Sequence, residues 1–161
     1  MAQPREIQKI LKLMNKTEFF KEFSSAEKKT IAGLKSLVAT HKRGDFVIRQ
    51  GETDSTIYIL LEGKLAITKN DAPDAELSTL HPGAIFGEVP LITGKSRTTN
   101  VIAKGKVIVV KMDGNSFAHL DPHILNKFKD QLLKLLIGRL DNMNKALAEL
   151  KASIQKFYAR V

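Results

Sequence analysis

The spacing of apolar residues changes twice along the chain, and this change limits most strongly what the chain can fold into. In the central part, apolar residues form short runs rich in β-branched side chains, which are typical of strands. Toward both ends they recur every three or four residues, which is typical of helices. The 161 residues are enough for one domain, so we expect an α+β fold with a β-rich centre between helical ends.

The centre predicts many short antiparallel strands. The runs that we assign as strands cover residues 46–48, 56–60, 65–67, 101–103 and 106–110. Gly, Asp and Pro residues separate them, and these residue types supply turns. Short strands at this spacing are typical of an antiparallel sandwich or roll. Glu62-Gly63 lies between two strong runs and predicts a hairpin turn.

Two helices are predicted before the strands. Residues 4–15 form an amphipathic pattern, with apolar residues at Ile7, Ile10, Leu11 and Met14. The segment Ser24-Ser25-Ala26-Glu27 resembles a capping box, because a hydroxyl precedes a glutamate by three residues. It predicts a second helix from about Ser25 to Val38, whose core face is formed by Ile31, Leu34 and Val38.

A long helix is predicted after Asp121-Pro122, a good helix start. A helix from there to the end of the chain would be roughly 55 Å long, so part of it must project from the domain or turn back. Its last three heptads carry a regular apolar seam: Leu140, Met143, Leu147, Leu150, Ile154, Phe157 and Val161. The seam fits a coiled-coil homodimer through residues 140–161 or packing against the chain's own helices.

Charge and composition exclude several classes of protein. The net charge of +9 lies at the two ends, since residues 1–43 carry ten Lys or Arg against four Asp or Glu and residues 121–161 carry eight against four. These cations are spread singly with little aromatic interleaving, so we interpret them as a solvated surface rather than a nucleic-acid interface. The chain has no cysteine, signal peptide or membrane-length apolar run, and we therefore expect a soluble, cytoplasmic protein.

The motifs of common enzymes and metal sites are incomplete. The segment Thr93-Gly94-Lys95-Ser96 resembles the end of a P-loop, but Val89 stands where that motif needs a glycine. The four histidines (His41, His81, His119 and His123) lack metal-ligand spacing, and no Gly-x-Ser-x-Gly elbow exists. We therefore expect no enzyme, no metal and no cofactor.

The segment 83–101 carries the strongest chemical pattern in the sequence. A glycine, Gly87, precedes the carboxylate Glu88, and an apolar turn separates them from Arg97, which lies among small hydroxyl residues. Glycine lets the backbone approach a ligand closely, the free N–H groups of a short helical turn suit a phosphate, and a guanidinium offers a fork of donors. A plain surface ion pair between Glu88 and Arg97 is the alternative.

The same segment resembles the phosphate-binding cassette of the cyclic nucleotide-binding domain family. The matching residues are Phe86-Gly87-Glu88 and Arg97-Thr98-Thr99-Asn100-Val101. Four other segments resemble the family's strand and turn signatures in the same order: 42–45, 49–52, 58–64 and 80–83. The resemblance covers about residues 17–140 and implies N-terminal helices, an eight-stranded antiparallel, jelly-roll-like β-roll, and hinge and lid helices.

This resemblance implies a ligand, cAMP or cGMP, and a set of ligand-binding residues. Glu88 would accept a hydrogen bond from the ribose 2′-hydroxyl, Arg97 would pair with the cyclic phosphate, and Thr98 would lie beside the base. The implied ligand-binding set is Phe86, Gly87, Glu88, Val89, Leu91, Arg97, Thr98 and Thr99. Pro90 and Thr99 depart from the family, which often has alanine at both positions. Proline lacks the N–H that commonly contacts the phosphate.

The resemblance also implies how such a domain is organised and how it signals. We expect one domain over 1–161, with N-terminal helices in 1–43, a roll in 44–115 that includes the cassette 83–101, and a hinge with a lid and dimerisation helix in 116–161. Leu132, Leu133 and Leu136 would close on the base, and the helix would swing near Phe117 to Asp121 to signal to an effector protein that the sequence does not name.

Two other functions fit the same residues. The chain resembles the sensor half of a transcription regulator of the catabolite-activator type, but its last helix shows no helix-turn-helix, so we do not expect it to read DNA directly. A ligand-free, dimerising scaffold is the other alternative, and the presence of both Glu88 and Arg97 argues against it.

Overall fold

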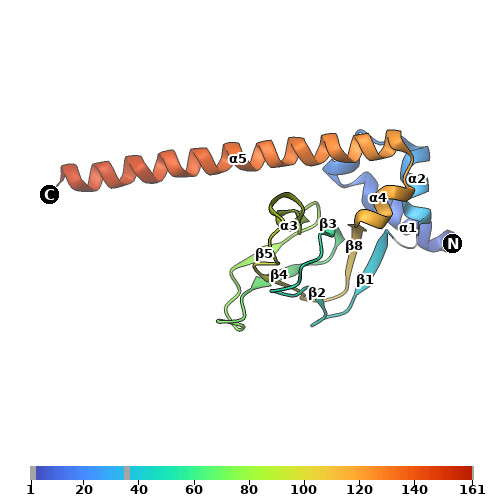
Figure 1. Cartoon of the computed structure of the whole chain (residues 1–161), viewed down its shortest axis with the longest axis horizontal. Helices are drawn as coiled ribbons and strands as arrows, with labels where there is room; N and C mark the ends of the chain where they lie inside the picture. The colour runs from blue at the N-terminus through green and yellow to red at the C-terminus, as the bar shows by residue number, and fades with distance from the viewer. Residues whose placement is uncertain (1–2, 35–36, 161) are drawn as a thin grey trace. The chain divides into compact units, whose positions relative to one another are not determined.

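Two four-stranded antiparallel sheets form the centre of the chain in this computed structural model, which describes residues 3–34 and 37–160 (Figure 1). The first sheet has the order β1 (Val38–His41), β8 (Val107–Met112), β3 (Ile57–Glu62), β6 (Ile85–Phe86). The second has the order β2 (Phe46–Ile48), β7 (Asn100–Ala103), β4 (Leu65–Thr68), β5 (Ser78–Leu80). The predicted eight-stranded antiparallel roll is confirmed.

Side chains from both sheets share one hydrophobic core. The central strands β3 and β8 are buried along most of their length, since each is flanked by a neighbour on both sides. Strands buried in this way appear as continuous apolar runs in a sequence, as the predicted runs 56–60 and 106–110 do. The core cluster consists of Val47, Ile48, Leu60, Leu65, Phe86, Val101, Ala103, Val107 and Val109.

The turn at Glu62-Gly63 is not a hairpin, and that prediction was wrong. β3 and β4 belong to different sheets, so the chain crosses between sheets at Gly63. Gly63 has a φ of +93°, and a Cβ there would clash with the carbonyl oxygen of Lys106. Sequence signals for a tight turn are local, whereas the choice of a partner strand depends on the rest of the fold.

Two N-terminal helices precede the roll, joined by a short 3-10 turn. Helix α1 (Pro4–Asn15) and the start of α2 (Ser25–Gly33) are as predicted, and η1 (Glu18–Phe20) lies between them. The capping box is present, because the backbone N–H of Glu27 donates to Ser24 Oγ and that of Ser24 donates to the Glu27 carboxylate. Helix α1 packs against α2 and contacts β3.

The predicted end of the second helix was wrong. Helix α2 stops at Gly33, and Val38 begins β1, where it pairs with Val110 of β8. The predicted helical segment 35–36 lies outside the described residues. Pairing with the central strand β8 overrides a weak local helical pattern here. The first strand therefore starts before Gly44, the boundary expected for the roll.

The C-terminal part contains two helices after the roll. A short helix, α4 (Gly114–His119), covers part of the predicted hinge, and α5 (Pro122–Ala159) is the long helix that Asp121-Pro122 predicted. By its contacts the chain divides into two units, Met1–Asp121 and Pro122–Val161, so α5 forms a unit by itself. Within the described ranges, no helix combines the length and the apolar character that crossing a membrane requires.

Candidate functional site

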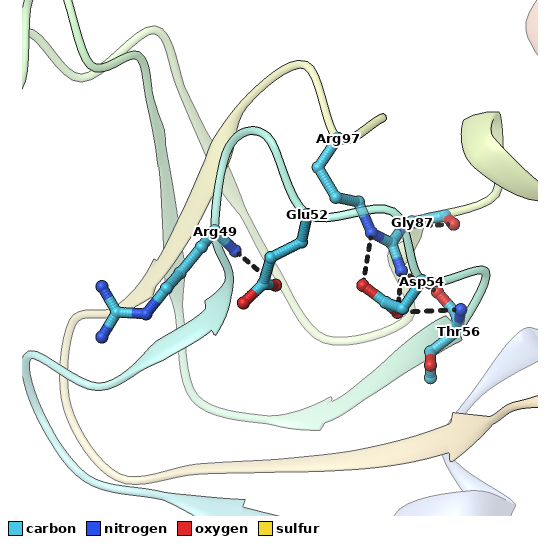
Figure 2. A network of polar contacts seen from close by, with 6 residues as sticks. All are labelled: Arg49, Glu52, Asp54, Thr56, Gly87 and Arg97. Carbon is cyan, nitrogen blue, oxygen red and sulfur yellow. Dashed lines mark hydrogen bonds and ion pairs between the residues drawn. The ribbon is translucent and has the colours of Figure 1, made fainter. Parts of the chain in front are cut away.

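The side chain of Arg97 is held inside the roll unit by two backbone carbonyls. Arg97 lies between helix α3 (Val89–Thr93) and strand β7, and only 3% of its surface is exposed. One terminal guanidinium nitrogen, Nη1, donates to the carbonyl of Gly87 at 2.7 Å, and the other, Nη2, donates to the carbonyl of Thr56 at 2.7 Å. These two carbonyls come from separate loops, so they fix the plane of the guanidinium (Figure 2).

A carboxylate occupies a further edge of the same guanidinium. Arg97 Nε lies 3.2 Å from Asp54 Oδ2, and Arg97 Nη2 lies 2.6 Å from Asp54 Oδ1 (Figure 2). The arginine lowers the pKa of Asp54 to about 2, chiefly through these side-chain hydrogen bonds. The pair is uneven in its exposure, because the Asp54 side chain is 44% exposed and that of Arg97 is 2% exposed.

The backbone of Arg97 joins the loop between β2 and β3. The N–H of Gly51 donates to the carbonyl of Arg97 at 2.8 Å, and the N–H of Arg97 donates to the carbonyl of Glu52 at 2.7 Å. The Glu52 carboxylate accepts a hydrogen bond from the backbone N–H of Arg49 (Figure 2). The loop that carries Asp54 is therefore tied to the cassette by main-chain as well as side-chain contacts.

Gly87 fits its position because it has no side chain. Its φ is +82°, a conformation that L side chains rarely adopt. A Cβ there would lie 2.8 Å from the carbonyl oxygen of Thr56 and 2.9 Å from Arg97 Nη1. The two atoms that would clash are themselves partners in the arginine network, so Gly87 and Arg97 depend on each other for their positions.

Helix α3 lies between Glu88 and Arg97 in the sequence. Glu88 is the N-cap residue of α3 and is 8% exposed, whereas Val89 and Leu91 are 45% and 43% exposed. Pro90 lies in the first turn, where the backbone N–H groups have no partner within the helix, so proline costs no helical hydrogen bond there. Gly94 ends the helix in the left-handed conformation, and its N–H donates to the carbonyl of Pro90.

The other predicted site residues lie in different environments. Phe86 is buried on β6, and its ring stacks on that of Tyr58 at a centroid distance of 5.1 Å. Thr98 is exposed, and Thr99 is partly buried. The structure thus brings Gly87 and Arg97 into contact and places Phe86 in the core. The predicted lid residues Leu132, Leu133 and Leu136 lie on α5, in the second unit.

The sequence patterns do not single out Asp54 and Thr56, which complete the arginine network. They precede Arg97 by 43 and 41 residues, and no spacing rule connects residues so far apart in the sequence. An open cavity of about 570 Å³ adjoins them. Its lining residues are Gly51, Glu52, Thr53, Asp54, Thr56 and Tyr58.

A network of amide side chains fixes the segment that follows Arg97. Asn100 Oδ1 accepts from the backbone N–H of Gln50, and Asn100 Nδ2 donates to Asn70 Oδ1, each at 2.8 Å. Gln50 Oε1 accepts from the backbone N–H of Asn70 at 2.8 Å. Asn100 is buried, and the three residues join the ends of β2, β4 and β7. This network holds the strand that leaves the cassette.

Comparison with known protein families gives a match over most of the roll. The sequence profile of the family described as "Cyclic nucleotide-binding domain" matches residues 38–121, which is more than half of the chain. The matched region contains all eight strands, the cassette and Asp54.

Curated relatives include a protein kinase and a regulatory subunit of a protein kinase. Human cGMP-dependent protein kinase 2 is 34% identical over 113 residues, and this match covers 67% of this chain and 14% of the kinase. The cAMP-dependent protein kinase regulatory subunit of Dictyostelium discoideum is 33% identical over 82 residues, covering 48% of this chain and 25% of the subunit. The chain thus spans a small part of the length of these relatives.

Solved structures confirm the fold. One described as "Sp-2Cl-cAMPS bound to PKAR CBD2" superposes with a TM-score of 0.62 at 24% identity, covering 92% of this chain and 94% of that one. A cyclic nucleotide-binding domain from Methylobacillus flagellatus superposes with a TM-score of 0.65 at 22% identity, covering 86% and 80%. Together with the sequence match, the roll and the cassette identify the chain as a member of the cyclic nucleotide-binding domain family.

Proposed function

We propose that this chain is a non-enzymatic regulatory module that binds a cyclic nucleotide, cAMP or cGMP, and transmits binding through α5. The observation that carries the proposal is the buried guanidinium of Arg97, oriented by the carbonyls of Gly87 and Thr56 in the segment that matches the family's cassette. A guanidinium held in a fixed plane carries paired N–H donors that suit an anionic group such as a phosphate.

The proposed contacts follow the chemistry of the side chains. Arg97 would bind the cyclic phosphate, with help from N–H groups near Gly87 and Glu88. The Glu88 carboxylate would accept from the ribose 2′-hydroxyl, the exposed Thr98 would lie beside the base, and Thr99 would line the site next to it. Phe86, which is buried against Tyr58, would support the wall rather than touch the ligand. Val89 and Leu91 are exposed on α3 and would contribute apolar surface beside the ligand.

The signal would pass through the C-terminal helix. We propose that Leu132, Leu133 and Leu136 close on the base and that α5 swings about the segment 117–121, which includes the end of α4. A ligand shifts such an equilibrium only as far as it binds one state better than the other. The heptad seam of residues 140–161 would join two copies, and an effector protein would receive the change.

A titration tests the binding step directly. Isothermal titration calorimetry of the full chain with cAMP and, separately, with cGMP is expected to give saturable one-to-one binding for at least one of them. Adenosine and guanosine, which lack the phosphate, should bind at least about tenfold more weakly, because a charge-assisted hydrogen bond is worth about 1.5–3 kcal/mol. Equal binding of a nucleoside and its cyclic nucleotide would contradict the role of Arg97.

A leucine substitution on α5 tests the proposed lid separately from the phosphate site. Replacing Leu133 by Ala removes apolar surface from the proposed lid, and Leu77→Ala makes the same change at a similarly exposed leucine outside the lid, the seam and the cassette. We expect Leu133→Ala to weaken cyclic-nucleotide binding by roughly threefold to tenfold, as about 1 kcal/mol of apolar contact is lost. Leu77→Ala should bind like the wild type. Equal affinities for both variants would exclude the lid.

A further inference from the structure

The guanidinium of Arg97 has already used most of its donors within the protein. An arginine side chain has five N–H groups. Four of them have acceptors here: one on Nη1 goes to Gly87, one on Nη2 goes to Thr56, and the remaining N–H of Nη2 together with that of Nε goes to Asp54. A phosphate that approaches Arg97 therefore meets donors that are largely occupied.

The occupied edge is the one that a phosphate would need. A guanidinium binds a carboxylate or a phosphate through two parallel N–H groups, and Nε with one terminal nitrogen forms such a pair. In this structure the two oxygens of Asp54 take up that edge, at 3.2 Å and 2.6 Å (Figure 2). The Arg97–Asp54 pair also has no net charge, so it attracts an anion less than a free arginine would.

The partners of Arg97 differ in how easily they can leave. The carbonyls of Gly87 and Thr56 belong to the backbone and cannot leave without moving their loops. Asp54 is a side chain on the loop between β2 and β3, with 44% of its surface exposed beside the cavity of about 570 Å³. A carboxylate in this position can turn toward solvent while both carbonyls still hold the guanidinium.

We propose that Asp54 is a built-in competitor for the phosphate and thereby sets the affinity of the site. Binding would exchange the Asp54 carboxylate for two phosphate oxygens on the Nε and Nη2 edge of Arg97, and Asp54 would turn into the adjoining cavity. This inference rests on the proposed function and deepens it, because it makes one residue responsible for how strongly the site prefers a charged nucleotide to a neutral nucleoside.

The substitution Asp54→Asn tests the competition. Asparagine keeps an oxygen in place of Asp54 Oδ1, which accepts from the backbone N–H of Thr56, so the local turn is retained. It removes the negative charge and one of the two acceptor oxygens. We expect Asp54→Asn to bind the preferred cyclic nucleotide at least about tenfold more tightly than the wild type in calorimetric titrations at one salt concentration. The affinity for adenosine should stay the same.

Glu52→Gln is the matched control. Glu52 lies in the same loop, and its side chain bonds the backbone of Arg49 rather than the guanidinium of Arg97. This change removes the same charge from the same region, so it measures how far the loss of one negative charge by itself alters the affinity for the cyclic nucleotide. We expect this change in affinity to be less than about threefold. Thermal unfolding followed by circular dichroism checks that both variants are folded.

The outcomes separate this inference from the proposed function. If the wild type binds a cyclic nucleotide and Asp54→Asn binds it equally or more weakly, the proposed function stands and the competition is excluded. An equal gain for adenosine, or for Glu52→Gln, also excludes it. If only Asp54→Asn binds, the competition is supported and the wild type is not a cyclic-nucleotide sensor. If no protein binds at millimolar ligand, both proposals fail.

Discussion

At the scale of single residues, the site depends on how a buried charge is satisfied. Arg97 is 3% exposed, and a buried cation is costly unless polar groups surround it. Here the carbonyls of Gly87 and Thr56 and the carboxylate of Asp54 surround the guanidinium. All three groups must keep their positions for the guanidinium to stay hydrogen-bonded. Small substitutions at these positions should therefore disturb the position of the Arg97 side chain more than they disturb the fold.

Gly87→Ala should weaken the site more than it weakens the fold. The methyl group would lie 2.8 Å from the Thr56 carbonyl oxygen and 2.9 Å from Arg97 Nη1, so one of these atoms must move. We expect at least about a tenfold loss of cyclic-nucleotide affinity, because the guanidinium loses a charge-assisted contact worth about 1.5–3 kcal/mol. Calorimetric titration measures the loss.

Gly44→Ala is the matched control for this prediction. Gly44 has nearly the same φ, +88°, and a Cβ there meets no atom within 4 Å. Both alanines carry the backbone strain of a left-handed residue, about 1–2 kcal/mol, and both should lower the melting temperature. A similar loss of affinity in both variants would show that strain, and not the contact with Arg97, controls binding.

The residues of the candidate site were predictable only where they lie within one short segment of the sequence. Gly87, Glu88 and Arg97 fall within one short segment whose residue types suggest a phosphate site. Asp54 lies 43 residues before Arg97, and its role depends on main-chain hydrogen bonds that join two loops. Such a contact follows from the folded topology, so no local pattern indicates it.

At the scale of elements, helix starts were predicted well and short strands were not. Ser24 and Pro122 mark helix starts by chemistry that acts within one turn. The strands β1, β5 and β6 were missed, whereas β2, which is as short as β5, was predicted because all three of its residues are apolar. The existence of the missed strands depends on pairing with β3, β4 and β8.

The last turns of α5 carry an apolar seam that predicts self-association. Leu140, Met143, Leu147 and Leu150 are 57–62% exposed on a helix that forms a unit alone. Their heptad spacing fits a two-stranded coiled coil, in which each helix covers the seam of the other. We expect the full chain to sediment as a dimer at micromolar concentration and a chain cut after Asn142 to sediment as a monomer.

A pair of point substitutions checks this prediction in the full chain. Leu147→Glu places a charge in the seam and should give a monomer. Ala148→Glu places the same charge at the next position, which lies outside the seam and is exposed, and should leave the dimer intact. If wild type and Leu147→Glu are both monomers, the seam does not join two copies.

At the scale of the whole molecule, stability should fall when the pH drops below neutral. His41 on β1 has a buried Nε2 atom without a hydrogen-bond partner among the described residues. Burial lowers its pKa from 6.5, and the nearby Asp45 opposes this shift only in part. The unfolded chain therefore binds a proton more readily than the folded chain, and the stabilisation is complete above about pH 7 and is lost as the pH falls.

Urea unfolding at pH 7.5 and pH 5.5 measures this effect. The free energy of unfolding should be lower at pH 5.5, and His41→Gln should reduce the difference between the two values. His81→Gln, a change at an exposed histidine, should leave the difference as in the wild type. An unchanged difference in His41→Gln would show that other groups cause the pH dependence.

The overall architecture was predictable because several independent patterns agreed. The change of apolar spacing, the glycine-rich breaks and the helix start at Pro122 all indicated an antiparallel sandwich or roll between helices, and the family resemblance indicated the roll. The path of the chain between the sheets was not predictable, as the crossing at Gly63 shows. Agreement between local signals defines the elements, whereas long-range pairing decides which elements become neighbours.

The most direct test of cyclic-nucleotide binding through Arg97 is a titration of the wild type and Arg97→Lys, side by side, with the same cyclic nucleotide. Lysine keeps the charge but is a single point of contact, so it cannot bind two phosphate oxygens in parallel or keep both carbonyl contacts. We predict saturable binding by the wild type and an affinity at least about tenfold lower for Arg97→Lys. Equal affinities would contradict the account and remove Arg97 from the binding site.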